Sequence, residues 1–196
     1  MLSRALNLIS LLAVALTACS TPAADDLVGA TIAKASLYIH TGDFISSPVI
    51  DAFSEEELAI LEEYRTELIA MIQQGLRRDG VGGALLAAHF KLQENIPDLR
   101  WRLFEPGTPY GWEGPDYDSE EDYLTDGQFV YHSVYLHAIE EAAGEPIHRA
   151  IEPTERELRV LQTYLENPPA LGSPSNRQYY WAKWLARNLQ VSTEAR

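Results

Sequence analysis

Three helix-start signals recur along the chain and constrain its fold more than any other feature. Each is a hydroxyl residue followed three positions later by Glu or Gln: Ser54 with Glu57, Thr154 with Glu157, and Ser175 with Gln178. In such a capping box the first side chain accepts a hydrogen bond from the backbone N–H of the later residue, whose side chain accepts one from the first backbone N–H. The boxes therefore predict at least three helices with defined starts.

Apolar residues at helical spacing extend this pattern. After Ser54 the spacing continues to about Arg78, where Asp79 and Gly80 end it. A second helix carries Leu85, His89 and Leu92, and we expect Pro97 to terminate it. Three more helices are predicted over residues 128–143, 154–166 and 175–190. Five helices with short links indicate a compact all-α domain.

Three segments do not fit this simple pattern. Residues 28–39 fit a helical stripe and a strand equally well. Leu99, Trp101 and Leu103 alternate with arginines, which predicts a short extended segment over residues 99–103. Residues 105–118 hold three prolines and three glycines and are predicted to form one long loop.

Composition and charge exclude several classes of protein. Hydrophobic residues make up 46% of the chain and charged residues 22%, which is typical of a globular protein rather than a disordered one. The formal net charge is −14, and a chain this acidic repels the phosphates of nucleic acid. The single cysteine rules out an intramolecular disulfide.

That cysteine follows a characteristic N-terminal segment. Arg4 precedes an apolar run over residues 6–16, which is too short to span a bilayer, and the run ends in Leu16-Thr17-Ala18-Cys19. This tetrapeptide resembles the lipobox of bacterial lipoproteins. The alternative is an ordinary secretory signal with an incidental cysteine.

The resemblance implies cleavage before Cys19 and attachment of acyl chains to this residue, which would anchor the protein stably in a membrane. Ser20, in place of an aspartate, implies sorting to the outer membrane with the domain facing the periplasm. We therefore expect a signal peptide over residues 1–18, a lipidated Cys19 and short tether over 19–26, and a single helical domain over 27–191.

An acidic interval supplies the candidate binding surface. No Lys or Arg occurs between Arg102 and Arg149. Acidic and aromatic residues cluster there, which suits the docking of a basic protein partner. The surface is predicted to comprise Tyr110, Trp112, Glu113, Asp116, Tyr117, Asp118, Glu120, Glu121 and Asp122.

Other readings of this interval remain open. The aromatic residues could pack back on the core, and the acids could form a solvated loop. Asp116, Asp118 and Glu120 imitate the first three ligands of a calcium-binding EF-hand loop, but Glu121 replaces the turn glycine and Gly127 replaces the bidentate glutamate.

Motifs for catalysis are lacking elsewhere in the sequence. None of the five histidines shows the HExxH spacing, and no GxSxG, Walker or dinucleotide motif occurs. His137 and Glu141 share a helical face, which suggests a surface pair or, with further ligands, zinc. Tyr179, Tyr180, Trp181 and Trp184 fit a core stripe or a glycan platform. We expect no cofactor.

These observations favour a non-catalytic function. The sequence predicts a membrane-anchored accessory or immunity-type module that binds a protein partner. The alternative is an envelope enzyme or glycan-binding protein that acts on peptidoglycan. It would use Tyr110 and Trp112 for stacking and Glu113 or Asp116 as acid and base.

Overall fold

The computed structural model describes residues 24–42, 48–78, 80–104, 119–125, 127–166, 168 and 176–191. These ranges contain helices and no strand, which confirms the predicted all-α class. The helices outnumber the five predicted, because one predicted helix is divided and several connecting segments are helical. In chain order they are α2 (Ala24–Thr41), α3 (Val49–Ala52), α4 (Glu55–Glu63), α5 (Arg65–Leu76), α6 (Val81–His89), the 3-10 helix η1 (Gln93–Asn95), α7 (Ile96–Phe104), α8 (Glu120–Thr125), α9 (Gly127–Ala143), α10 (Ile147–Ala150), α11 (Glu155–Leu165) and α12 (Asn176–Asn188).

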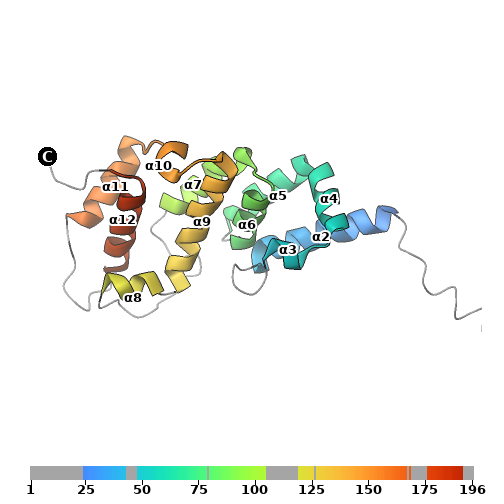
Figure 1. The fold of residues 1–196 in the computed structure, drawn as a ribbon, viewed down its shortest axis with the longest axis horizontal. Coiled ribbons are helices and arrows are strands. Elements are labelled where there is room, and N and C mark those ends of the chain that lie inside the picture. The colour runs from blue at the N-terminus through green and yellow to red at the C-terminus, as the bar shows by residue number, and fades with distance from the viewer. Residues whose placement is uncertain are drawn as a thin grey trace, which may run out of the picture.

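The helices are arranged along an elongated molecule (Figure 1). Helices α2 to α5 lie at one end, and α8, α11 and α12 lie at the other. Between the two ends, α9 packs against both α6 and α7, while α6 also packs against α2 and α5. Helix α12 packs against α11 and contacts α8. Helices α6 and α9 therefore connect the two ends of the molecule.

One cluster of buried apolar side chains runs through this arrangement. A buried hydrogen bond joins the C-terminal helix to it: the indole Nε1 of Trp181 donates to the carbonyl oxygen of Leu103 over 3.1 Å. This bond satisfies the polar atom of a tryptophan that is only 2% exposed. Fully buried members of the cluster include Ile39, Leu61, Leu68, Ile72, Leu86, Leu99, Leu103 and Leu185.

Two of the three predicted capping boxes are confirmed. The hydroxyl of Ser54 accepts from the N–H of Glu57 over 3.2 Å, and the Ser54 N–H donates back to the Glu57 carboxylate over 2.8 Å. Thr154 and Glu157 form the same pair of bonds at 3.3 and 2.6 Å. The third box cannot be followed, because Ser175 lies outside the described residues.

The helix predicted from Ser54 to Arg78 is divided. Tyr64 has φ −96° and ψ 35°, which ends α4 and begins α5. The break coincides with a long-range contact, because the neighbouring Arg65 donates from Nη1 to the carbonyl oxygen of Phe90 over 2.9 Å. The break between α4 and α5 thus coincides with a tertiary contact to the end of α6. The spacing of apolar residues in the sequence does not reveal this break.

The predictions around Pro97 are wrong. Pro97 does not end a helix but lies in the first turn of α7, where its missing N–H costs no hydrogen bond. Residues 99–103 are helical rather than extended. Leu99 and Leu103 are four residues apart, so one helical face buries both of them completely. The alternating pattern fitted this arrangement as well as it fitted a strand.

The N-terminal part of the described chain is also helical. The ambiguous residues 28–39 belong to α2, and α2 begins at Ala24, so the last three residues of the predicted tether are helical as well. None of the helices that the structure describes is both long enough and apolar enough to pass through a membrane. Cys19 and the rest of the predicted signal lie outside the described residues.

Helices α2 and α6 approach closely because glycines lie at the N-cap and in the first turn of α6. A Cβ atom added to Gly82 would collide with the backbone carbonyl of Tyr38 in α2. An added Cβ on Gly80 would lie 2.7 Å from the carbonyl oxygen of Ile39. Such distances are impossible without a shift of the backbone, so these glycines determine how near the two helices can lie.

Candidate functional site

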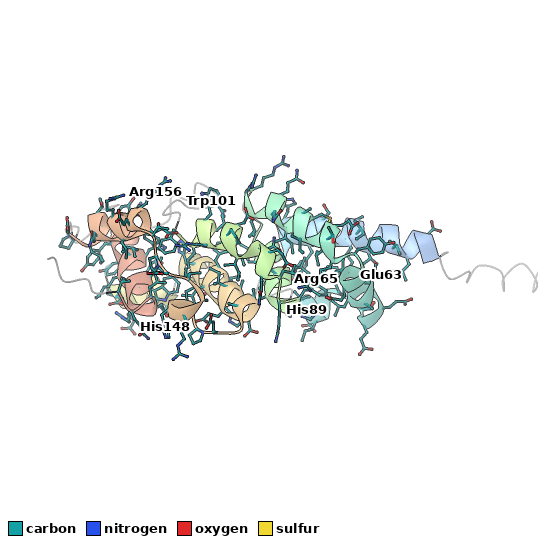
Figure 2. The ribbon with its side chains drawn as sticks, turned by 90° about the horizontal axis from the view of Figure 1, so that it is seen from above. Glu63, Arg65, His89, Trp101, His148 and Arg156 are labelled. Atoms are coloured by element: carbon teal, nitrogen blue, oxygen red, sulfur yellow. The ribbon has the colours of Figure 1, made fainter. Side chains whose placement is uncertain are left out.

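A groove of about 780 Å³ lies between α7 and α11. Among the described residues, aromatic and aliphatic side chains form much of its surface, together with two threonines and two charged residues. Trp101 and Phe104 come from α7, and Thr154, Arg156, Glu157, Val160, Thr163 and Tyr164 come from α11 and the residue before it. Figure 2 shows Trp101 and Arg156 projecting from the same side of the molecule.

The orientation of Trp101 follows from the amphipathic pattern of α7. Leu99 and Leu103 face the core and are completely buried. Trp101 is two residues from each, which rotates it by about 200° around the helix axis. Its indole is therefore turned away from the core and is 48% exposed. The guanidinium of the buried Arg102 lies 5.5 Å from the Trp101 ring centre and helps to fix the indole in place.

A charged contact fixes the two walls of the groove relative to each other. Arg100 of α7 donates from Nε to the carboxylate of Glu157 in α11 over 2.7 Å. Its Nη2 also donates to the carbonyl oxygen of Glu152 over 2.7 Å. These bonds join residues more than fifty positions apart in the chain. Because both side chains of the ion pair are partly buried, solvent screens the pair less than a surface salt bridge.

The ion pair keeps Glu157 in its charged form. Burial alone would raise the pKa of this carboxyl, but hydrogen bonds from Arg100 and from Thr154 lower it below its ordinary value. The same contact raises the pKa of Arg100. A carboxylate that is held ionised and already hydrogen-bonded is a poor proton donor or acceptor near neutral pH. Glu157 therefore supports the groove rather than offering acid–base chemistry.

The opposite wall is positioned by packing within the C-terminal region. The Tyr164 ring stands edge-on to Trp181, with 6.1 Å between ring centres. The hydroxyl of Thr163 donates to the carbonyl oxygen of Arg159 over 2.8 Å, within α11. Arg156 is exposed at the groove. The walls can thus take an apolar or aromatic group, while Arg156 offers N–H donors beside it.

Most of the predicted binding surface lies outside the described residues. This holds for Tyr110, Trp112, Glu113, Asp116, Tyr117 and Asp118. The remaining members are Glu120, Glu121 and Asp122, which form the first turn of α8. Their predicted role in partner binding stays a prediction.

Two of these three acids have partners within the chain. One carboxylate oxygen of Glu120 binds Lys183 Nζ and the other binds Arg187 Nη2, both over 2.6 Å. Asp122 accepts a 2.8 Å hydrogen bond from the hydroxyl of Ser119. Glu121 is exposed. The charge that the sequence suggested for a basic partner is thus partly neutralised by α12.

The histidines and the C-terminal aromatic residues occupy other positions. His137 and Glu141 are exposed on α9, and no group of three or more metal-binding side chains occurs among the residues that the structure places. Trp181 and Trp184 are buried, which confirms the core interpretation for these two side chains. Tyr179 and Tyr180 are half-buried beside them.

Sequence reasoning missed the groove. Trp101 carries a signal, since it is a tryptophan between two leucines, but the alternating pattern around it predicts an extended segment. Arg156 belongs to a predicted helix that carries several other charged residues, so the sequence does not single it out. Comparison with protein-family models, with curated proteins and with solved structures found no significant match. The arrangement of these side chains therefore carries the functional argument.

Proposed function

We propose that the protein is a lipid-anchored, non-catalytic module of the bacterial envelope that captures a protein partner. The groove between α7 and α11 is the observation that carries this proposal. Trp, Tyr and Arg are the residue types enriched where binding energy concentrates in protein interfaces, and Trp101, Tyr164 and Arg156 combine them in one concave site. Among the groove residues that the structure describes, Glu157 is the one carboxylate, and its engagement with Arg100 favours binding over acid–base catalysis.

The anchor is proposed from the N-terminal segment. Acylation of Cys19 would place the membrane surface close to the domain, because four residues lie between Cys19 and the start of α2 at Ala24, and this connection spans at most about 18 Å. The net charge of −14 would accelerate encounters with a basic partner. Because Ser20, rather than an aspartate, follows Cys19, we propose that the protein is anchored in the outer membrane and faces the periplasm.

Affinity capture from solubilised envelopes tests the partner. We expect the wild-type chain to retain one stoichiometric protein, and the Trp101→Ala variant to lose it. Leu37→Ala is a matched control, because Leu37 is also an exposed large apolar side chain but lies on α2. The identified partner is then titrated against the purified chain. Equal retention by the Trp101→Ala variant would remove the groove from the proposal.

The anchor needs a separate test, so that the two parts of the proposal can fail independently. We expect intact-mass measurement to show acyl chains on the wild-type protein, and the Cys19→Ala variant to fractionate with soluble proteins. An unmodified Cys19 in a mature chain would contradict the lipoprotein assignment and leave the groove experiment unaffected.

A glycan is the second candidate ligand. The half-exposed indole of Trp101, with the hydroxyl residues Thr154 and Thr163 in the same groove, suits a sugar ring that stacks on one face and hydrogen-bonds at its edge. Sedimentation with purified peptidoglycan sacculi separates the two candidates. Binding that depends on Trp101, without any protein partner, would favour the glycan.

A further inference from the structure

A second cavity, of about 390 Å³, lies beside the C-terminal helix and is separate in its lining from the α7–α11 groove. Tyr179, Lys183 and Arg187 follow one another at intervals of four residues, so they share a face of α12. Leu165 at the end of α11 and Val191 after α12 add apolar surface. The cavity thus combines cationic side chains with apolar walls.

One acidic side chain forms ion pairs with the two basic side chains of this cavity. Glu120 of α8 binds Lys183 through one carboxylate oxygen and Arg187 through the other. A carboxylate offers about four acceptor sites, whereas a lysine and an arginine together carry about eight N–H donors. The contact therefore leaves N–H donors unused, and because two cations meet one carboxylate, one unit of positive charge remains in excess among these three side chains. The Lys183 and Arg187 side chains remain 41% and 60% exposed, so an incoming group can reach them.

Holding two cations one helical turn apart has a cost. Like charges four residues apart destabilise a helix, and Glu120 compensates for one of the two. The rest of the chain is acidic, but salt screens charges more than about 10 Å away, so distant carboxylates repel a bound anion only weakly. Lysine and arginine side by side are the donors that proteins use for phosphate oxygens. The Tyr179 side chain lies one turn further along the same face.

We propose that this cavity binds a phosphate group, with Lys183 and Arg187 as its ligands and Glu120 as a competing anion. The source of the phosphate is either a small soluble phosphate ester or the headgroup of an anionic phospholipid. Both present the same oxygens to the same donors. The proposal is independent of the groove and of its partner.

Calorimetric titration of the full chain with inorganic phosphate, at about 150 mM salt, tests the shared chemistry. We expect one site with a dissociation constant of about 1 mM, as for a few charge-assisted hydrogen bonds. Lys183→Gln and Arg187→Gln should each weaken binding about tenfold. Arg159→Gln is the control, because Arg159 is an exposed arginine on α11 that does not line the cavity. It should leave the affinity unchanged.

Glu120→Gln distinguishes a ligand site from a purely structural ion pair. If Glu120 competes with the ligand, removing its charge should tighten phosphate binding about fivefold, the size expected for one charge about 6 Å away in a water-exposed site. Misfolding cannot produce tighter binding, so this result stays informative even if α8 loosens. No saturable binding at 20 mM phosphate, or equal weakening by Arg159→Gln, would overturn the proposal.

Vesicles identify the source. In the Cys19→Ala background, which removes the proposed acyl anchor, we expect either sedimentation with phosphatidylglycerol vesicles, absent with phosphatidylcholine and lost in Lys183→Gln, or phosphate binding with no such sedimentation. The first result assigns a lipid headgroup and the second assigns a soluble phosphate ester. Vesicle binding that persists in both Lys183→Gln and Arg187→Gln would contradict a role of this cavity.

Discussion

Glu57 and Glu157 occupy equivalent positions in two copies of one local arrangement. Each is the third residue of a capped helix and accepts from the backbone N–H of the capping residue. Each also binds a base from another helix, Lys34 at 2.7 and 2.8 Å for Glu57, and Arg100 for Glu157. The short helices α3 and α10, both begun by proline, precede the two boxes. One glutamate thus both starts a helix and attaches it to a neighbouring helix.

The partner base of Glu157 should matter for stability. We expect Arg100→Ala to lower the free energy of unfolding by about 2 kcal/mol, because it removes charge-assisted hydrogen bonds and leaves a partly buried carboxylate unpaired. Arg159→Ala is the comparison, since its contact with Glu155 is 3.7 Å long and mostly exposed, and should cost under about 0.5 kcal/mol. Urea denaturation measures both. Equal effects would show that the α7–α11 contact has no special role.

Acid should weaken the fold in a defined range. Burial raises the pKa of Glu57, Glu120 and Glu157, but hydrogen bonds from basic side chains outweigh it and leave each folded-state pKa below 4.5. The unfolded chain then binds more protons than the folded chain, so stability is fully present above about pH 4.5 and falls as the pH falls below it. Unfolding free energies between pH 6 and 3 check this. Glu157→Gln should flatten the slope, whereas Glu63→Gln, an exposed position on α4, should not.

Two glycines should respond to alanine in opposite directions. Gly82→Ala would drive a Cβ into the carbonyl of Tyr38, so we expect a loss of about 3 kcal/mol or more. Gly29 lies in α2 with open space around it, and alanine there should stabilise the helix by about 0.5–1 kcal/mol. Thermal and urea denaturation give the sign of each change. A neutral Gly82→Ala variant would contradict the close crossing of α2 and α6.

The two tryptophans of the groove region should separate binding from folding. Trp181 is buried, and Trp181→Ala should cost about 4 kcal/mol. Trp101 is 48% exposed, and Trp101→Ala should cost less than about 1.5 kcal/mol while abolishing ligand capture. A large stability loss in Trp101→Ala, measured by denaturation, would mean that the indole serves packing instead.

Local sequence signals predicted a helix boundary well where that boundary does not depend on contacts with distant residues. The boxes at Ser54 and Thr154 were found because all their bonds are made within four residues. The division at Tyr64 was missed, because the accompanying Arg65 contact reaches a residue 25 positions away. Pro97 was misread because proline is compatible with both the start of a helix and the end of one.

The candidate site was harder to predict than the fold. A groove exists only once two helices are placed relative to each other, and Arg100 and Glu157, which fix α7 against α11, are 57 residues apart. The ion pairs of Glu120 have the same origin, since Lys183 and Arg187 come from the last helix. The sequence shows that acidic residues are present. Whether basic side chains neutralise them depends on tertiary contacts between distant parts of the chain.

The hydrogen bond from Trp181 to Leu103 has a consequence for the order of folding. It spans 78 residues, whereas the contact between Lys34 and Glu57 spans 23. Closing the longer loop costs more chain entropy. The N-terminal helices can therefore associate before the contact between the end of α7 and α12 has formed. During synthesis the last helix is also the last to appear. A chain that stops before α12 would expose apolar surface around Leu103, and proteases that act on incomplete proteins could recognise it there.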